Sequence, residues 1–329
     1  MELIISGYGR QLSDTLALYT FYGNKSDCKW QASIDDASFV CSGDGYLFTV
    51  TEAETYAVVY LFQQSATGYE LLDQKQIEGG ALCHITYSPV NKALFGACYG
   101  TGTLFSVRVE EGKLGEVLFH EVQTKEEQNA LTRAHCVLLN QSETVLAAVN
   151  IALDRIFIYQ IKAGYLSPSG YIDLPEGAGP RHMIYSREES LIYIITEYSN
   201  EIFIYKNNGK YELLQKISTL APDFTGSSNC STLCFSQDGS YLYAANRGAD
   251  TIAVFAVRED GTLQWRGEQD CGGKHPRHMI ISMDNSNLIV CNQLSNQVVI
   301  FELDQQSGGL LRKAGTIPFS APSGILELI

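Results

Sequence analysis

The sequence predicts an all-β fold, a seven-bladed β-propeller with four antiparallel strands in each blade. Two observations carry this prediction: a repeat along the whole chain, and two chain ends that complement each other. Repeats of about 40–50 residues that hold four short strands are typical of propeller blades. The composition agrees, because 29 Gly but only 8 Pro among 329 residues, with 11% aromatic residues, suit short strands joined by tight turns.

The repeat is clearest between residues 179–186 (GPRHMIYS) and 275–282 (HPRHMIIS). Midway between them, residues 229–236 (NCSTLCFS) keep the pattern without the Pro-Arg-His. A polar turn and an apolar strand follow each segment, and an alternating strand comes next. One position of that alternating strand recurs in all seven units, at Tyr19, Tyr60, Val107, Tyr159, Tyr205, Phe255 and Phe301.

The two ends of the chain predict how the ring closes. Residues 3–21 have the middle strands of a blade but lack an innermost strand before them, whereas residues 321–329 look like an innermost strand alone. We expect the two ends to pair within one blade, which hides two sheet edges and makes residues 1–329 a single domain. A solenoid is the competing architecture, but it needs polar caps at both ends, and this tail is apolar.

Charge and cysteine content limit the partners and the compartment. The net charge of −14 disfavours nucleic acid and anionic membranes, which are bound through clustered Lys and Arg. No apolar window is long enough to cross a bilayer, and the N-terminus lacks the features of a secretion signal. Nine cysteines without a CxxC pair favour reduced thiols in the cytoplasm. We expect a solvated loop at Glu126 and Glu127, and the sequence does not indicate an oligomeric state.

Two positions in each blade are expected to face one mouth of the channel, because the first and second strands are antiparallel. The start of the innermost strand carries Ser38, Cys83, His135, Arg181, Ser231, Arg277 and Ser323. The end of the second strand carries Gln11, Glu52, Tyr99, Ile151, Glu197, Arg247 and Gln293. Next to the first set come His84, His182 and His278. These positions predict a polar site at that mouth.

A structural role is the alternative for each of these residues. An Arg at a strand start can bond the carbonyls of the next blade, and an Arg–Glu pair can brace two blades; for His84 and His278 the structural role is favoured. The predicted gathering of these side chains favours a functional role. Removing a carboxylate, several guanidiniums and an imidazole from water together costs free energy, which a purely structural role does not require. Phosphate-loop, dinucleotide, serine-elbow and zinc motifs are absent from the sequence, so we expect neither a metal nor an organic cofactor.

Residues 176–183 (EGAGPRHM), followed by Thr196-Glu197, resemble the signature of the propeller-type 6-phosphogluconolactonase family, which also includes the fungal carboxymuconate cyclase. Residues 83–84, 97–99 and 236–248 extend the resemblance, which covers essentially all seven blades. The family's proposed site residues match His135, Arg181, Glu197 and Arg247. Blade four departs from the family pattern, since Arg133-Ala134-His135 stands where His-x-His is common and residues 150–155 also differ.

The resemblance implies hydrolysis of 6-phospho-D-glucono-1,5-lactone to 6-phosphogluconate, in the pentose phosphate pathway, without a cofactor. Arginine suits both anionic tasks of this reaction, because its guanidinium stays charged and binds oxyanions in bidentate fashion. We assign Arg181 and Arg247 to the carbonyl oxygen, and Arg277 with His182 to the phosphate. His84 and Tyr99 are further candidates for substrate binding.

The general base is either Glu197 or His135, and the other donates the proton. Flanking arginines lower the pKa of a carboxylate, which favours His135 as the base.

Three other functions stay open at this point. The first is a cycloisomerase that acts on a carboxymuconate-like dicarboxylate and needs no phosphate. The second is a calcium-dependent lactonase, for which Asn150, Asn246 and Asn292 with Glu197 are a weak ligand set. The third is a propeller without catalysis that serves protein interaction.

Overall fold

The computed structural model describes residues 1–12, 14–125 and 131–328. These residues form seven four-stranded antiparallel sheets and one short 3-10 helix, η1 (Gln293–Ser295). The four-stranded blades predicted from the repeat are therefore confirmed. The loop predicted at Glu126 and Glu127, and the last residue, Ile329, lie outside the described residues.

Six sheets consist of four strands that follow one another along the chain. The first of them contains β4 (Val40–Gly43), β5 (Tyr46–Glu52), β6 (Ala57–Ser65) and β7 (Gly68–Ile77). The second contains β8 (Leu82–Ser88), β9 (Ala93–Cys98), β10 (Thr103–Glu110) and β11 (Lys113–Val122). The third contains β12 (Ala134–Leu139), β13 (Val145–Asn150), β14 (Arg155–Lys162) and β15 (Tyr165–Asp173). The fourth contains β16 (Pro180–Tyr185), β17 (Leu191–Thr196), β18 (Glu201–Lys206) and β19 (Leu213–Ser218). The fifth contains β20 (Asn229–Phe235), β21 (Tyr241–Arg247), β22 (Thr251–Val257) and β23 (Leu263–Asp270). The sixth contains β24 (Pro276–Ile281), β25 (Asn287–Asn292), β26 (Gln297–Leu303) and β27 (Leu310–Pro318).

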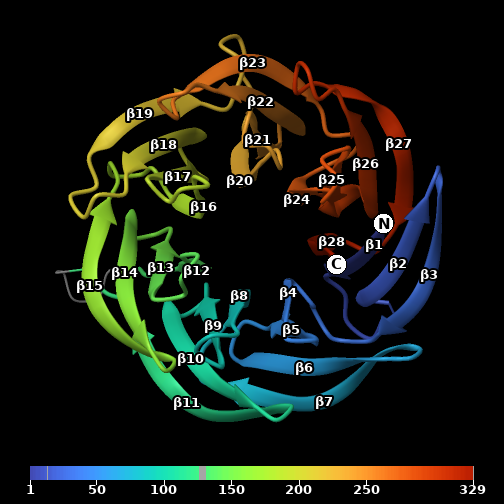
Figure 1. Cartoon of the computed structure of the whole chain (residues 1–329), viewed down its shortest axis with the longest axis vertical. Helices are drawn as coiled ribbons and strands as arrows, with labels where there is room; N and C mark the ends of the chain where they lie inside the picture. The colour runs from blue at the N-terminus through green and yellow to red at the C-terminus, as the bar shows by residue number, and fades with distance from the viewer. Residues whose placement is uncertain (13, 126–130, 329) are drawn as a thin grey trace. The chain divides into compact units, whose positions relative to one another are not determined.

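The seventh sheet joins the two ends of the chain. Its order is β28 (Pro322–Glu327), β1 (Glu2–Gly7), β2 (Leu16–Tyr22) and β3 (Lys25–Ala32). Strand β28 pairs antiparallel with β1, with Leu3 opposite Glu327 and Ile5 opposite Ile325, and Figure 1 shows the two strands side by side. The predicted pairing of the chain ends within one blade is confirmed.

Internal contacts divide the chain into two compact units. The first unit comprises Met1–Gly7, Tyr19–Cys28 and Arg181–Ile329, and the second comprises Tyr8–Leu18 and Lys29–Pro180.

Within each sheet, burial differs between the middle and the outermost strands. The middle strands β17, β21 and β25 are buried at nearly every position, and their sequences are short apolar runs. The outermost strands β19 and β23 are mostly exposed or half-buried. In the first unit, apolar side chains from neighbouring sheets form shared cores, in which Tyr193 packs with Phe255 and Tyr243 with Phe301. A continuous apolar run is what a strand covered on both faces requires.

One predicted position needs correction. In six sheets the recurring residue of the third strand comes directly after a register shift in the pairing of the third with the fourth strand. On its other side it pairs with an aliphatic residue of the second strand, as Phe255 does with Leu242. In the sheet β4–β7 this residue is Phe62, which pairs with Leu47, and not the predicted Tyr60. The hairpin between the second and third strands is two residues longer in this sheet, since Leu47 and Phe62 are 15 positions apart whereas Leu242 and Phe255 are 13 positions apart. The β-bulge adds one residue, Leu72, to the fourth strand and does not shift the third strand against the second.

Candidate active site

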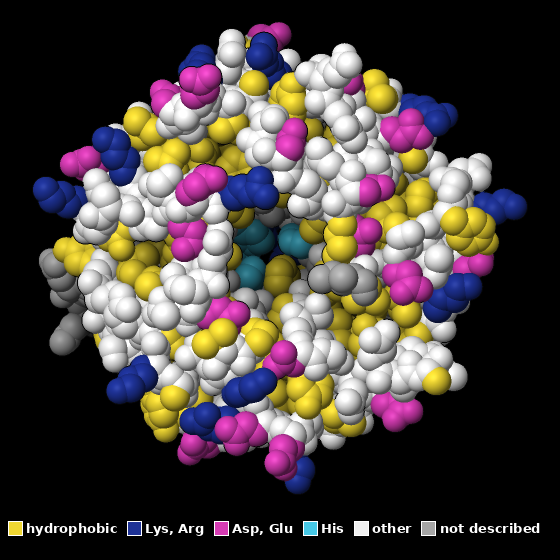
Figure 2. Space-filling model, in the orientation of Figure 1, with side chains coloured by type: hydrophobic (Ala, Val, Ile, Leu, Met, Phe, Trp, Pro, Cys, Tyr) yellow, Lys and Arg dark blue, Asp and Glu magenta, His cyan; other side chains and the backbone are white. Residues whose placement is uncertain are grey.

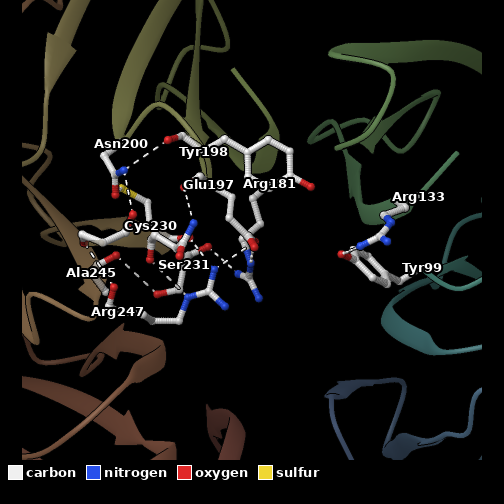
Figure 3. Close-up of polar contacts among 12 residues, drawn as sticks. Tyr99, Arg133, Arg181, Glu197, Tyr198, Asn200, Cys230, Ser231, Ala245 and Arg247 are labelled. Carbon is white, nitrogen blue, oxygen red and sulfur yellow. Dashed lines mark hydrogen bonds and ion pairs between the residues drawn. The ribbon is translucent and has the colours of Figure 1, made fainter. Parts of the chain in front are cut away.

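Two arginines from neighbouring sheets converge on Glu197 in the first unit. Arg181 is the second residue of β16, Glu197 directly follows β17, and Arg247 is the last residue of β21. Arg181 Nε lies 3.1 Å from Glu197 Oε2, and Arg247 Nη2 lies 2.9 Å from the same oxygen. Figure 3 shows both guanidiniums pointing toward this carboxylate. The predicted convergence of these three residues is therefore present.

The cluster is shielded from water to different degrees. The exposed fraction of the side chain is 3% for Arg181, 8% for Arg247 and 18% for Glu197. Burial alone raises the pKa of Glu197, but the charges of Arg181 and Arg247 outweigh it and hold the pKa below its ordinary value. Glu197 is therefore ionised at neutral pH, and it is a weak base.

Both arginines also brace the neighbouring strand β20. Arg181 Nη1 donates to the carbonyl oxygen of Ser231. Arg247 donates through Nε to the carbonyl oxygen of Asn229 at 3.2 Å and through Nη2 to that of Cys230 at 2.8 Å. The Ser231 hydroxyl likewise donates to the carbonyl oxygen of Pro276 in β24. The structural role considered as an alternative thus coexists with the ion pairs.

Two polar atoms of the cluster remain available to a ligand. Arg247 uses Nε and Nη2 for its contacts, and Glu197 uses only Oε2 of its carboxylate. Within the described part of the chain, Arg247 Nη1 and Glu197 Oε1 have no hydrogen-bond partner. A donor and an acceptor on one preorganised pair can bind a polarised oxygen and a hydroxyl at the same time.

Further cationic and imidazole groups surround the cluster in the first unit. The charge of Arg277 contributes to the low pKa of Glu197, although less than Arg181 and Arg247. Burial and the charges of Arg181 and Arg277 lower the pKa of His278 to about 4. The His278 ring lies 6.4 Å from the ring of His182, which is buried. The predicted residues Arg277, His182 and His278 thus belong to the same unit as the cluster.

The sequence prediction missed His275. Burial and the charges of Arg247 and Arg277 lower its pKa to about 4, against the opposing charge of Asp250. His275 belongs to the repeated HPRH segment, but it precedes the innermost strand and was outside both predicted sets. The signal that could have identified it is the exchange of Gly179 in one repeat for a histidine in the other.

The second unit contains a separate cluster around Tyr99. The Arg133 guanidinium carbon lies 4.7 Å from the centre of the Tyr99 ring, and Arg133 Nη1 donates to the Tyr99 hydroxyl (Figure 3). The buried His135 ring lies 6.0 Å from Tyr99, edge to face. Two predicted residues, Tyr99 and His135, therefore lie together, and Arg133 joins them because its cation stacks on the aromatic face.

His84 has structural contacts in the second unit. Its ring is 4.1 Å from that of Phe39, and its Nδ1 accepts a hydrogen bond from the Val137 backbone at 3.4 Å. Its Nε2 lies 3.7 Å from the thiol of Cys136. These contacts attach β8 to β12, so they support the structural role that was favoured for His84. A substrate contact of His84 stays a prediction.

Charged side chains of both signs are interspersed over the face drawn in Figure 2. An anionic ligand must therefore be attracted by a local group of cations such as the one at Glu197. Among the described residues, no three His, Cys, Asp or Glu side chains gather in a way that could hold a metal ion. The described residues also include no helix that is long and apolar enough to span a membrane.

Comparison with known proteins identifies the family. Residues 2–326 match the model of the family described as "Lactonase, 7-bladed beta-propeller", and the chain belongs to this family of lactone hydrolases. The chain is 28% identical to the 6-phosphogluconolactonase of Bacillus subtilis over 309 residues, which are 90% of this chain and 88% of the relative. It is 30% identical to an uncharacterized protein of Staphylococcus epidermidis, with 85% of each chain covered.

Solved structures show the same fold. The periplasmic gluconolactonase of Pseudomonas aeruginosa matches with a TM-score of 0.91 at 23% identity, covering 99% of this chain and 98% of that one. A protein of Bacteroides fragilis described as a putative 6-phosphogluconolactonase matches with a TM-score of 0.90 at 23% identity, covering 99% and 97%. The seven sheets are thus the blades of a seven-bladed β-propeller.

Proposed function

We propose that this lactone hydrolase acts on 6-phospho-D-glucono-1,5-lactone and releases 6-phosphogluconate, as a step of the pentose phosphate pathway. The observation that carries the proposal is the partly buried carboxylate held by two buried arginines in a family of lactonases. The name of the Bacillus subtilis relative supports the phosphorylated substrate.

The first step of the reaction is the attack of water on the lactone carbonyl carbon. The new carbon–oxygen bond forms while a base removes a proton from the water, and the carbonyl oxygen takes up the electron pair. Arg247 Nη1 and the guanidinium of Arg181 would donate to this oxyanion and stabilise it, because preorganised donors favour developing charge. Glu197 keeps the two guanidiniums in place, and its Oε1 would accept a hydroxyl of the sugar.

The second step breaks the bond between the former carbonyl carbon and the ring oxygen. The ring oxygen receives a proton and becomes a hydroxyl, and the carboxylic acid that forms ionises at neutral pH. The low pKa of Glu197 makes it a weak base, which supports an imidazole for the proton transfer. His135 is the imidazole favoured by the sequence; it belongs to the second unit, and its role stays a proposal. Arg277 with His182 is proposed to bind the phosphate.

The test is a hydrolysis assay with freshly generated phospholactone, followed by acid release at constant pH. Wild-type protein should exceed the spontaneous rate, and Glu197→Gln should abolish most of the excess. The matched control is Glu201→Gln, which replaces the carboxylate of an ion pair with the exposed Lys216 in the same blade, and should leave turnover unchanged. Equal rates on phosphorylated and unphosphorylated lactone would refute the phosphate specificity, and loss of activity with a chelator would favour the calcium-dependent alternative.

We also propose that residues 1–329 are one domain and that the protein works in the cytoplasm. A single cooperative unfolding transition observed by two probes would support the single domain. Cell fractionation tests the compartment, and recovery of the protein outside the cytoplasmic membrane would refute it.

A further inference from the structure

The backbone of Arg133, which directly precedes β12, is held on both sides by the end of β13. Its N–H donates to Asn150 Oδ1 at 3.0 Å, and its carbonyl oxygen accepts the N–H of Ile151 at 3.0 Å. Asn150 is fully buried, and its Nδ2 donates to Gln123 Oε1 at 3.0 Å and to Thr132 Oγ1 at 2.8 Å. The Arg133 side chain therefore starts from a fixed point of the backbone.

The guanidinium of Arg133 is held as well, by Tyr99, which directly follows β9 in the preceding blade. Arg133 Nη1 donates to the Tyr99 hydroxyl, and the guanidinium carbon lies 4.7 Å from the centre of the ring (Figure 3). The buried His135 ring contacts Tyr99 edge to face at 6.0 Å. Tyr99 thus fixes the orientation of a cation that is only half-buried.

A second arginine of the same blade shows how such a cation is neutralised within the fold. The Arg155 guanidinium lies 3.9 Å from the centre of the Tyr171 ring, and its Nε and Nη2 donate to the two carboxylate oxygens of Asp173 at 2.6 and 2.9 Å. Arg133 also has a tyrosine, but among the described residues no carboxylate pairs with it. The Nε and Nη2 atoms of Arg133 likewise have no hydrogen-bond partner in the described part of the chain. The comparison indicates that an anion from outside the protein completes this position.

We propose that Arg133 and Tyr99 form a binding site for a small oxyanion, a phosphate or a carboxylate group. Nε and Nη2 of a guanidinium form a planar fork that matches two oxygens of either group. The Tyr99 hydroxyl accepts from Arg133 Nη1 and keeps its own hydrogen to donate, so it supplies a third donor. The net charge of −14 gives no general attraction for anions, so binding here depends on this local cation. The site goes beyond the proposed lactone hydrolysis and does not depend on it, since no residue of the Glu197 cluster takes part in it.

Protection of Arg133 from phenylglyoxal, which modifies accessible guanidiniums, tests this site in the full-length wild-type protein. Inorganic phosphate, acetate and chloride are compared at a constant ionic strength of about 0.15 M, which screens weak attraction between exposed charges. Peptide mass spectrometry measures the modification of each arginine separately. Phosphate, acetate or both should slow the modification of Arg133 relative to chloride, and protection by one anion alone identifies the group that binds. The control in the same sample is Arg312, which is 74% exposed and paired with Glu302, and no anion should protect it.

The variant Tyr99→Phe keeps the aromatic face and removes the hydroxyl. The concentration of the protecting anion that gives half-protection of Arg133 should rise by about tenfold or more, because hydrogen bonds to charged groups are stronger than those between neutral groups. The matched control is Tyr171→Phe, which makes the same change at the tyrosine that stacks on Arg155 and should leave the protection of Arg133 unchanged.

Two results would overturn the site. Equal modification of Arg133 in all three anions would leave Arg133 as a brace of Tyr99. Absence of modification in chloride would also exclude the site, because the reagent and the ligand need the same open side of the guanidinium. Unchanged half-protection in Tyr99→Phe would overturn the part assigned to Tyr99. The assay contains no lactone, so none of these outcomes bears on the proposed hydrolysis.

Discussion

Replacing Arg181 by lysine separates the two tasks of this side chain. Arg181 pairs with Glu197 at 3.1 Å and also donates to the carbonyl oxygen of Ser231, while only 3% of its side chain is exposed. Lysine keeps the charge but lacks the planar fork, so it cannot make both contacts in the same geometry.

The contacts of Arg181, combined with general magnitudes, set the expected size of both effects. At an effective dielectric of about 20, an ion pair at this distance is worth roughly 5 kcal/mol before desolvation, which offsets most of it. A buried carbonyl left without a donor costs about 1–3 kcal/mol, and we expect a loss of unfolding free energy in that range. The loss of one oxyanion donor lowers turnover by about 10²–10³, or roughly 2.7–4 kcal/mol. The activity should therefore suffer more than the stability.

Urea unfolding and kcat per folded molecule measure the two effects on the same preparation. The control is Arg312→Lys, which changes an arginine that is 74% exposed and paired with Glu302, and should alter neither quantity. If Arg181→Lys lowers stability while turnover per folded molecule stays at the wild-type value, Arg181 only braces the blades, and its role at the oxyanion is wrong.

Three further predictions follow from closure, thiol state and histidine burial. Deleting residues 321–329 removes β28 and uncovers residues 3–5, which are fully buried. Because burying each of these apolar side chains stabilises the fold by about 1.5–3 kcal/mol, the protein should become insoluble or much less stable. A soluble truncation with an unchanged Tm would contradict this. Thiol titration of denatured protein purified without reductant should count nine, and seven or fewer would contradict the reducing compartment. Stability should fall as the pH drops from about 6.5 toward 4, because His275 and His278 have a pKa of about 4 in the fold and stay neutral while the unfolded chain takes up protons. The variant His278→Asn should reduce this slope, and a flat profile would refute the lowered pKa of these imidazoles.

The blades could be predicted from the sequence because each blade of a propeller is encoded by a similar pattern of strands and turns. In the blades of β17, β21 and β25 an apolar second strand is followed by a third strand with four buried residues in a row, and similar signals recur along the chain. The closing pair of β1 and β28 was predictable as well, because each end lacks what the other supplies. The error at Tyr60 has a local cause: the hairpin between β5 and β6 is two residues longer than the one between β21 and β22, and the spacing of the repeat alone does not reveal this.

The site was predictable only where strand ends determine it. Arg181, Glu197 and Arg247 stand at fixed places on antiparallel strands, so topology alone brought them together. The position of His275 depends on a left-handed backbone and on the hydrogen bond that its N–H donates to Asp250 of the preceding blade, and neither can be inferred from residue spacing. Arg133 is similar, because its position depends on stacking over Tyr99, which lies in another blade.

The most direct test of the account is the rate of hydrolysis of fresh 6-phospho-D-glucono-1,5-lactone by wild-type protein and by Glu197→Gln, measured side by side with the spontaneous rate. The account predicts a wild-type rate well above the spontaneous one, and a variant close to it that still binds 6-phosphogluconate, since Arg181 and Arg247 keep their charges. A wild-type rate equal to the spontaneous one, or a variant as fast as the wild type, would contradict it.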